Sequence, residues 1–170
     1  MPLPPDPAPA DRTTEHPEAI AATGDALRAV LRSVASPVVV VTVDGVAGAA
    51  RRGATIGSFA SVSLDPPLVS FNVTHGSRLH DALGTTDAFT VHLLADDQAD
   101  VAASFAQPAS SDEVPRLDGT LGALACSVQA RVAAGDHTVV IGEVTRVTPG
   151  RDAAPLLYYR KSYRGIGSEV

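Results

Sequence analysis

A run of β-branched residues near position 40 constrains the fold of this chain most strongly. Val38 to Val41 are four consecutive valines, and Thr42 and Val43 continue the run up to an Asp44-Gly45 pair. β-Branched side chains favour strands, and Asp-Gly favours the positive φ angles of a tight hairpin turn. The sequence therefore predicts a strand over residues 38–43 with a hairpin turn directly after it.

Further stretches of the chain have the composition of strands, and a few have that of helices. Apolar residues at near-helical spacing between Ala19 and Pro37 predict one amphipathic helix before the strands. Gly135-Asp136 separates two strand patterns and predicts a second hairpin turn. This order predicts a mainly β protein, an antiparallel barrel with a few peripheral α-helices. The other predicted strands are 55–63, 68–73, 89–94, 126–133 and 138–147, and the other predicted helices are 77–83 and 96–105.

The distribution of prolines and apolar residues predicts the domain organisation. Six of the 13 prolines fall within the first 17 residues, so residues 1–18 are predicted to be a disordered Pro-rich tail. A chain of 170 residues that is 45% hydrophobic supports one core, which predicts a single domain over residues 19–170. The polar loop at 107–119 is predicted to be mobile or to act as a lid.

Charge, aromatic content and cysteine usage argue against several classes of partner. A net charge of −6 with 4% aromatic residues makes nucleic acid an unsuitable partner. The apolar runs are far shorter than the roughly 20 residues that cross a bilayer, so no membrane association is expected. Cys126 is the single cysteine and lies in a strand pattern, which predicts a buried thiol and a cytoplasmic protein.

The histidines and serines show none of the local motifs of metal or nucleophile sites. The spacing of the histidines predicts no metal site, and the rings of His75 and His80 are not expected to share a face. His92 is predicted to be an ordinary solvent-facing or partner-facing strand residue. Gly-x-Ser-x-Gly, Gly-x-Gly-x-x-Gly and phosphate-loop motifs do not occur, which disfavours the usual hydrolase and dinucleotide folds.

Small and hydroxyl residues concentrate between Gly53 and Pro67. Thr55, Ser58 and Ser61 can donate hydrogen bonds, and Gly53 and Gly57 allow a ligand to approach the backbone closely. Further on, Gly76-Ser77-Arg78 opens a helix, where amides and a guanidinium suit an anion. These features favour a bound phosphate or polar ring edge, although an edge strand and a simple helix cap explain each feature singly.

These segments carry a resemblance to a known family. Residues 53–67, followed by Leu68-Val-Ser-Phe-Asn and Ser77-Arg78, resemble the flavin-binding core of the flavin reductase family, which has the FMN-binding split-barrel fold. Gly135-Asp136-His137-Thr138, with Ile141-Gly-Glu-Val144, and Pro155-Leu-Leu-Tyr-Tyr-Arg160 resemble the same family in the same order. Members are the reductase components of two-component flavin monooxygenases, and the resemblance covers residues 27–163.

The resemblance implies an antiparallel split β-barrel that forms a homodimer and acts as an NAD(P)H:flavin oxidoreductase. FMN or FAD would bind at the subunit interface, with NADH or NADPH as co-substrate, and reduced flavin would pass to a separate oxygenase. His137 would contact the nicotinamide nucleotide as the catalytic residue, with Tyr159 near it. The residues implied in flavin binding are Ala54, Thr55, Ile56, Gly57, Ser58, Ser61, Phe71, Asn72, Val73, Ser77, Arg78 and Tyr159.

The chain also departs from the family pattern, and other functions stay open. Leu79 stands where relatives often have a hydroxyl residue, Pro37 replaces a small residue, and Asp112 to Arg116 occupy a segment that precedes a tryptophan in relatives. The alternatives are a non-catalytic flavin-binding split barrel and a barrel that binds nucleic acid or oligosaccharide. The sequence leaves open the choice among FMN, FAD and riboflavin, the choice between NADH and NADPH, and the partner oxygenase.

Overall fold

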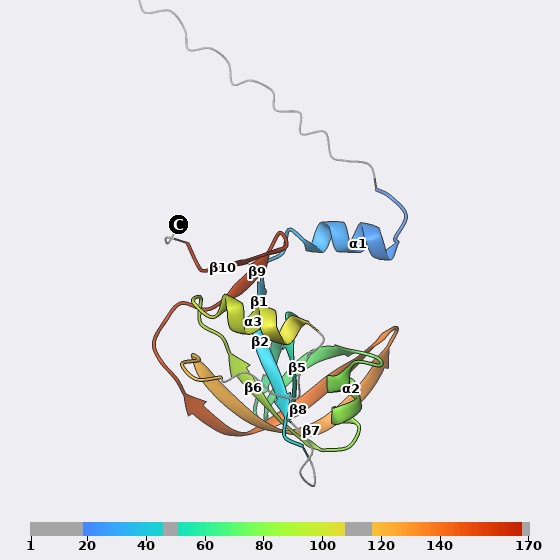
Figure 1. Ribbon diagram of the computed structural model, residues 1–170. Helices are drawn as coiled ribbons and strands as arrows, with labels where there is room; N and C mark the ends of the chain where they lie inside the picture. Colours follow the sequence, from blue (N-terminus) through green and yellow to red (C-terminus); the bar gives the residue numbers. More distant parts are fainter. Residues whose placement is uncertain (1–18, 46–50, 108–116, 168–170) are drawn as a thin grey trace, which may run out of the picture.

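The computed structural model describes residues 19–45, 51–107 and 117–167, and the predicted tail at 1–18 lies outside these ranges (Figure 1). The helices in the described residues are α1 (Gly24–Leu31), α2 (Arg78–Leu83) and α3 (Ala99–Ala106). The strands are β1 (Ser36–Pro37), β2 (Val39–Val43), β3 (Arg52–Ile56), β4 (Ala60–Leu64), β5 (Pro67–Thr74), β6 (Ala88–Leu93), β7 (Gly122–Ala134), β8 (His137–Pro149), β9 (Leu157–Tyr159) and β10 (Ser162–Arg164).

A seven-stranded sheet in the order β3-β2-β6-β7-β8-β5-β4 forms the body of the protein. Each neighbouring pair is antiparallel, which confirms the predicted mainly β, antiparallel fold. The two edge strands, β3 and β4, follow each other in the sequence and are joined by residues 57–59. The sheet therefore curls until its two edges come together near this short connection.

Two clusters of buried apolar residues form the core of the protein. The first core fills the inside of the curled sheet and includes Val41, Phe71, Phe89 and Val140. The Phe71 and Phe89 rings pack edge to face with their centroids 5.3 Å apart. A Cβ atom at Gly142 would lie 2.3 Å from the Phe89 ring, so this position of β8 requires glycine to admit the ring. Gly142, which carried part of the family resemblance, is therefore a packing residue of the barrel.

A second core lies outside the barrel, between the sheet and α3. Phe105 of α3 packs with Val40 and Leu156 in this cluster. A Cβ atom at Gly53 would lie 2.7 Å from the Phe105 ring, so the space beside this glycine is taken by a core side chain. Gly53 is therefore a packing residue on this face, and the approach of a ligand to its backbone stays a prediction.

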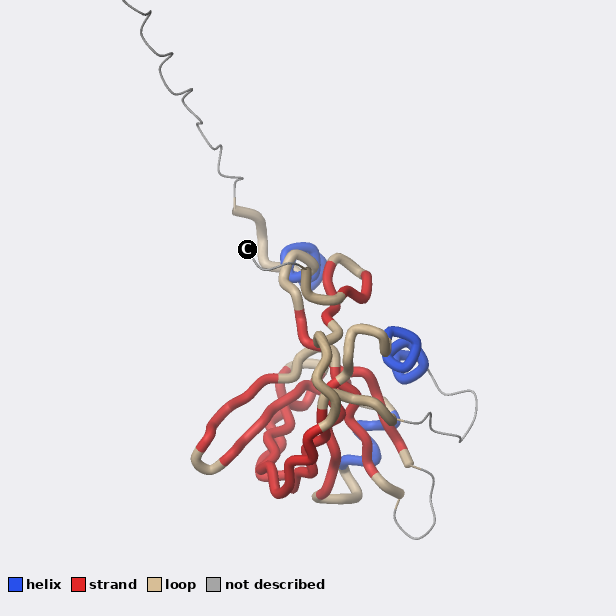
Figure 2. The backbone as a smooth tube through the Cα atoms, turned by 90° about the vertical axis from the view of Figure 1, so that its left-hand side faces the viewer, coloured by secondary structure: helices blue, strands red, loops and turns tan. Residues whose placement is uncertain are grey.

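The small second sheet was not predicted from the sequence. β1, β9 and β10 form this sheet in the order β1-β9-β10, and they lie between the barrel and α1 at the top of Figure 1. Helix α1 begins after the N-cap Thr23, whose Oγ1 accepts a hydrogen bond from the Ala26 amide at 3.2 Å. No residue of α1 is buried, although the whole helix belongs to the described residues, and Figure 2 shows it at the end of the molecule away from the large sheet.

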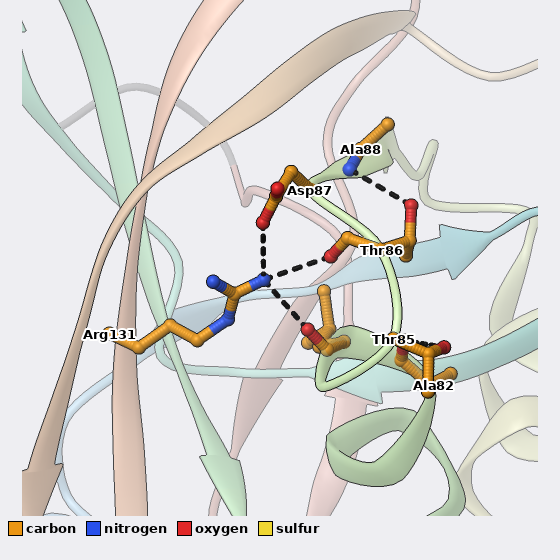
Figure 3. A network of polar contacts seen from close by, with 7 residues as sticks. Ala82, Thr85, Thr86, Asp87, Ala88 and Arg131 are labelled. Carbon is orange, nitrogen blue, oxygen red and sulfur yellow. Dashed lines mark hydrogen bonds and ion pairs between the residues drawn. The ribbon is translucent and has the colours of Figure 1, made fainter.

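Helix α2, in contrast, is held at both ends. Its N-cap, Ser77, accepts a hydrogen bond from the His80 amide, and Leu79 and Leu83 are buried in the first core. At the other end Arg131 of β7 reaches across to the end of the helix (Figure 3). Arg131 Nη2 donates to the Leu83 carbonyl at 2.8 Å, to the Thr86 carbonyl at 2.9 Å and to Asp87 Oδ1 at 3.0 Å.

Several predicted boundaries were wrong. The single strand predicted over 55–63 is two strands, because residues 57–59 reverse the chain between β3 and β4. β2 ends at Val43 and β3 begins at Arg52, so residues 44–51 join them and Asp44-Gly45 is not a two-residue hairpin turn. The third helix begins later than predicted, at Ala99, and the first helix ends at Leu31, before the predicted stop at Pro37, although it begins after Thr23, one of the two caps that the sequence offers. Most of the predicted loop at 107–119 lies outside the described residues.

The predictions for the Gly135-Asp136 turn and for Cys126 were correct. The Gly135-Asp136 turn joins β7 to β8, and Gly135 has a φ of +61° that favours glycine. Cys126 is buried, and burial raises the pKa of its thiol to about 11, so it behaves as a core residue. No helix within the described ranges is long and apolar enough to span a membrane.

Candidate functional site

A row of polar residues, bonded in two separate groups, lies on the outer face of the barrel beside the connection between its edge strands. Ser58, in the connection between β3 and β4, accepts a hydrogen bond on Oγ from the Asn72 amide at 2.9 Å. Pairing between β4 and β5 extends only as far as Ser70 of β5, so the Ser58 hydroxyl takes over beyond the end of β4. Asn72 and Thr74 alternate with the buried residues of β5 and therefore share the exposed face.

His137 continues this row on the neighbouring strand. Thr74 and His137 are cross-strand partners, and Thr74 Oγ1 lies 3.1 Å from His137 Nε2. On the other side of the ring, His137 Nδ1 lies 2.7 Å from Asp136 Oδ1. This hydrogen bond is the main reason that the pKa of the Asp136 carboxyl is lowered. The imidazole is thus in contact with a hydroxyl at one nitrogen and a carboxylate at the other.

The start of α2 lies directly after this row. The Ser77 amide donates to the Thr74 carbonyl at 3.3 Å, which connects the helix start to the end of β5. Arg78 is the first residue of α2 and is exposed. We call Ser58, Asn72, Thr74, Ser77, Arg78 and His137 the candidate site.

Alternation along the strands turns several predicted site residues away from this face. Ile56, Phe71 and Val73 are 7%, 0% and 3% exposed and belong to the first core, so only their backbone is available to a ligand. Ala54 packs against the same core. The Thr55 hydroxyl donates to the Ala102 carbonyl of α3 at 2.6 Å, so this hydrogen bond fixes α3 on β3.

The remaining predicted residues lie near the β3–β4 connection or in the small sheet. Gly57 is exposed, and the nearest atom to a Cβ placed there is the Ser36 Cβ at 3.9 Å. Ser61 is exposed on β4. Tyr159 is half-buried on β9, with the Arg160 guanidinium 5.3 Å from its ring centroid. Tyr159 thus belongs to a different sheet from His137, and no recorded contact among the described residues joins the two.

The structure tests the predictions for three histidines. The rings of His75 and His80 approach to 5.1 Å between centroids, so the prediction that they do not share a face is wrong. The turn at Gly76, with a φ of +72°, returns the chain so that α2 starts beside the end of β5. His92 is half-buried and bonded to Thr42 at 3.0 Å, and burial is the main reason that its pKa is lowered. His92 is thus not fully exposed to solvent, and the partner-facing alternative stays a prediction.

Sequence reasoning missed two residues that contact His137. Thr74 lies two residues after Asn72 and therefore on the same face of β5. The Gly135-Asp136 turn places His137 opposite Thr74, so strand alternation and the position of the turn could have predicted this contact. Asp136 was assigned only to the turn, although its carboxylate binds the ring. Across residues 19–45, 51–107 and 117–167, no group of three His, Cys, Asp or Glu residues could hold a metal ion.

The donors and acceptors present fit a phosphorylated flavin. β3 is an edge strand, so one side of its backbone has no partner strand in the described part of the chain and can bond a polar ring edge. Ser58 and Asn72 are exposed beside that edge and offer a hydroxyl and an amide. The Arg78 guanidinium suits a phosphate group.

Comparison with known proteins defines the class. The family model described as the flavin reductase like domain matches residues 31–167. An NADH:FMN oxidoreductase of Rhodococcus erythropolis is 41% identical over 152 residues, covering 80% of this chain and 78% of that protein. The reductase component of 4-hydroxyphenylacetate 3-monooxygenase of Thermus thermophilus is 36% identical over 145 residues, covering 84% and 96%.

Solved structures agree with this result. The NADH:FAD oxidoreductase SgcE6 of Streptomyces globisporus, determined in complex with NAD and FAD fragments, has a TM-score of 0.76 and 30% identity, covering 83% of this chain and 91% of that chain. The chain belongs to the flavin reductase family. The predicted function, an NAD(P)H-dependent flavin reductase that supplies reduced flavin to a monooxygenase, is confirmed over the non-catalytic flavin-binding alternative.

Proposed function

We propose that this flavin reductase oxidises NADH with FMN as the acceptor, and that the candidate site binds both. The observation that carries the proposal is that Ser58, Asn72, Thr74 and His137 lie at least partly exposed on the β3–β4 connection and on the neighbouring strands β5 and β8, next to the edge of β3 that has no partner strand in the described part of the chain. A bound flavin supplies the redox chemistry, since its ring accepts a hydride from the nicotinamide. The protein has to bind the two molecules and orient them.

We assign flavin binding to both ends of the polar row. The backbone of Ala54 to Ser58 would bond the ring and ribityl chain, together with the side chains of Ser58, Ser61 and Asn72. Ser77 and Arg78 would hold the phosphate, because a hydroxyl and a guanidinium favour an anion there. Ile56, Phe71 and Val73 are buried, so their share is limited to main-chain contacts and to fixing the position of the strand.

We assign the nicotinamide nucleotide to His137, with Tyr159 as a second contact. His137 is 39% exposed at its side chain and lies at the start of β8, beside Thr74. An imidazole can bond a carboxamide or a hydroxyl and can stack on a ring. This role makes His137 the catalytic residue in the sense that it touches the molecule that is oxidised.

FMN and NADH are the first choices because several relatives carry both in their names. FAD remains the second choice, since the related SgcE6 structure contains NAD and FAD fragments. We propose that reduced flavin passes to a separate oxygenase, since relatives include reductase components of monooxygenases. The single buried cysteine is consistent with a cytoplasmic enzyme.

We further propose a homodimer with the flavin between the subunits. α1 is amphipathic but has no buried residue, and Val62 and Leu64 of the edge strand β4 are 50% and 88% exposed. Apolar surface of this kind on a chain of 170 residues is typical of a subunit interface. A second copy would also supply walls that this chain does not supply alone.

NADH oxidation with and without added flavin tests the proposal. Purified protein is mixed with NADH, and absorbance at the nicotinamide band is followed after FMN, FAD or riboflavin is added. We expect oxidation that depends on flavin, fastest with FMN, and faster with NADH than with NADPH. Flavin binding without NADH or NADPH oxidation would refute the proposed function and favour a flavin carrier.

A further inference from the structure

The imidazole of His137 has a protein partner at each of its two nitrogens. Asp136 Oδ1 lies 2.7 Å from Nδ1, and Thr74 Oγ1 lies 3.1 Å from Nε2. These are ordinary hydrogen-bond distances. The ring is therefore held between a residue of the β7–β8 turn and a residue at the end of β5.

The chemistry of the two partners fixes where the proton of a neutral ring must lie. An ionised carboxylate only accepts hydrogen bonds, so Nδ1 has to donate to Asp136. The pKa of Asp136 is lowered, chiefly by its hydrogen bond to His137, which keeps the carboxylate ionised. Nε2 of the neutral ring then carries a lone pair and accepts from the Thr74 hydroxyl, which can donate.

The backbone holds these partners in place. The His75 amide donates to the Asp136 carbonyl at 3.0 Å, which ties the turn to the segment after β5. Thr74 and His137 are paired in register across β5 and β8. The position of Asp136 beside the ring is therefore set by the sheet and does not depend on a flexible side chain alone.

We propose that Asp136 is a positioning residue, which holds His137 with the proton on Nδ1 so that Nε2 serves as a hydrogen-bond acceptor for the nucleotide. This inference rests on the proposed function of His137 and specifies how it is exercised. Nε2 takes a hydrogen bond from Thr74 before the nucleotide binds and from an N–H or O–H group of the nucleotide afterwards. Thr74 thus donates to Nε2 while the nucleotide is absent, and this hydrogen bond keeps the ring oriented.

Nuclear magnetic resonance of the imidazole nitrogens tests the tautomer directly, without flavin or nucleotide. Spectra are recorded at increasing pH until the His137 signals stop moving, and the two-bond nitrogen–proton couplings of the neutral ring then distinguish the tautomers. We expect the Nδ1–H form of His137 to predominate. In Asp136→Asn the Nε2–H form should gain population, because an amide can either donate or accept.

Asp152→Asn is the matched control. It removes the same charge from an exposed aspartate beyond the far end of β8 and should leave the His137 signals unchanged. Thr74→Val should move the Nε2 signal to that of a nitrogen without a hydrogen bond, and Thr74→Ser should restore it. A wild-type ring in the Nε2–H form, or an unchanged tautomer in Asp136→Asn, would overturn the inference.

Kinetics then connect the tautomer to the nucleotide. If the competent tautomer falls to about a fifth of the population in Asp136→Asn, the apparent KM for NADH rises about five-fold. The kcat at saturating NADH and the affinity for FMN should stay at wild-type values. A shifted tautomer with an unchanged KM would also overturn the inference. Absence of NADH oxidation by the wild type would instead refute the proposed function and would leave the tautomer result standing.

Discussion

Two short helices of this protein have similar N-caps but very different surroundings. Helix α1 has a Thr23 cap and α2 has a Ser77 cap, and each hydroxyl accepts a hydrogen bond from an amide three residues on. In α2, Leu79 and Leu83 are 1% and 2% exposed, whereas in α1 the leucine at position 31 is 52% exposed. Local signals thus start both helices, but only α2 is secured by the barrel.

The difference shows that an N-cap alone does not stabilise a short helix. An isolated helix of eight residues is marginal in water, so packing has to supply most of its stability. Helix α2 obtains this from the first core and from Arg131, and as a result it holds Ser77 and Arg78 firmly beside β5. Helix α1 obtains no such packing from the described residues of its own chain, which agrees with our proposal that a second copy covers it.

The largest expected effect comes from the core side of α2. Leu83→Ala removes a fully buried side chain and should lower the free energy of unfolding by about 2–5 kcal/mol. Urea denaturation followed by circular dichroism measures this change. A loss below about 1 kcal/mol would mean that α2 is not secured by the core, and the comparison between the helices would fail.

The next effect concerns the function of the start of α2. Arg78→Ala removes a charge-assisted contact worth about 1.5–3 kcal/mol and should weaken FMN binding roughly ten- to a hundred-fold. Riboflavin lacks the phosphate, so its affinity should not change. Fluorescence titration with both flavins measures the difference, and equal losses for the two would limit Arg78 to a capping or surface role.

A smaller effect is expected at the other end of α2. Arg131→Ala leaves three acceptors without their guanidinium donor and should lower the free energy of unfolding by about 1–3 kcal/mol. Arg146→Ala, at an exposed arginine of β8, is the control and should change stability by less than about 0.5 kcal/mol. Equal effects for the two variants would show that the contacts in Figure 3 do not secure α2.

The smallest effect on folding is expected for α1. Leu31→Ala should change the free energy of unfolding by less than about 0.5 kcal/mol in dilute protein, because the side chain is exposed. The same variant should raise the dissociation constant of the dimer, measured by analytical ultracentrifugation. A loss of stability as large as that of Leu83→Ala would show that α1 packs on its own barrel, and an unchanged dimer would exclude α1 from the interface.

The sequence predicted the barrel well because its strands carry strong local signals. The valine run that forms β2 and the Gly135-Asp136 turn between β7 and β8 are examples. β1, β9 and β10 were missed because strands of two or three residues are too short to show a period. The reversal at residues 57–59 was missed because the β-branched residues on either side of it, Thr55, Ile56 and Val62, resemble one continuous strand.

The candidate site was predicted in part. The resemblance led to Asn72 and His137, but it also included Phe71 and Val73, which strand alternation places on the opposite face from Asn72. Period-two alternation could have separated them in advance. The approach of His75 to His80 was not predictable, because it depends on how the turn at Gly76 orients α2 against β5.

Anaerobic stopped-flow reduction of the protein–FMN complex by NADH tests the central claim most directly. The wild type should bleach the flavin absorbance in a phase whose rate depends on NADH concentration. His137→Ala should need more NADH or react at least several-fold more slowly, while its affinity for FMN changes little. Reduction of the variant at the wild-type rate, with an unchanged dependence on NADH, would contradict the assignment of His137 and with it the location of the nucleotide site.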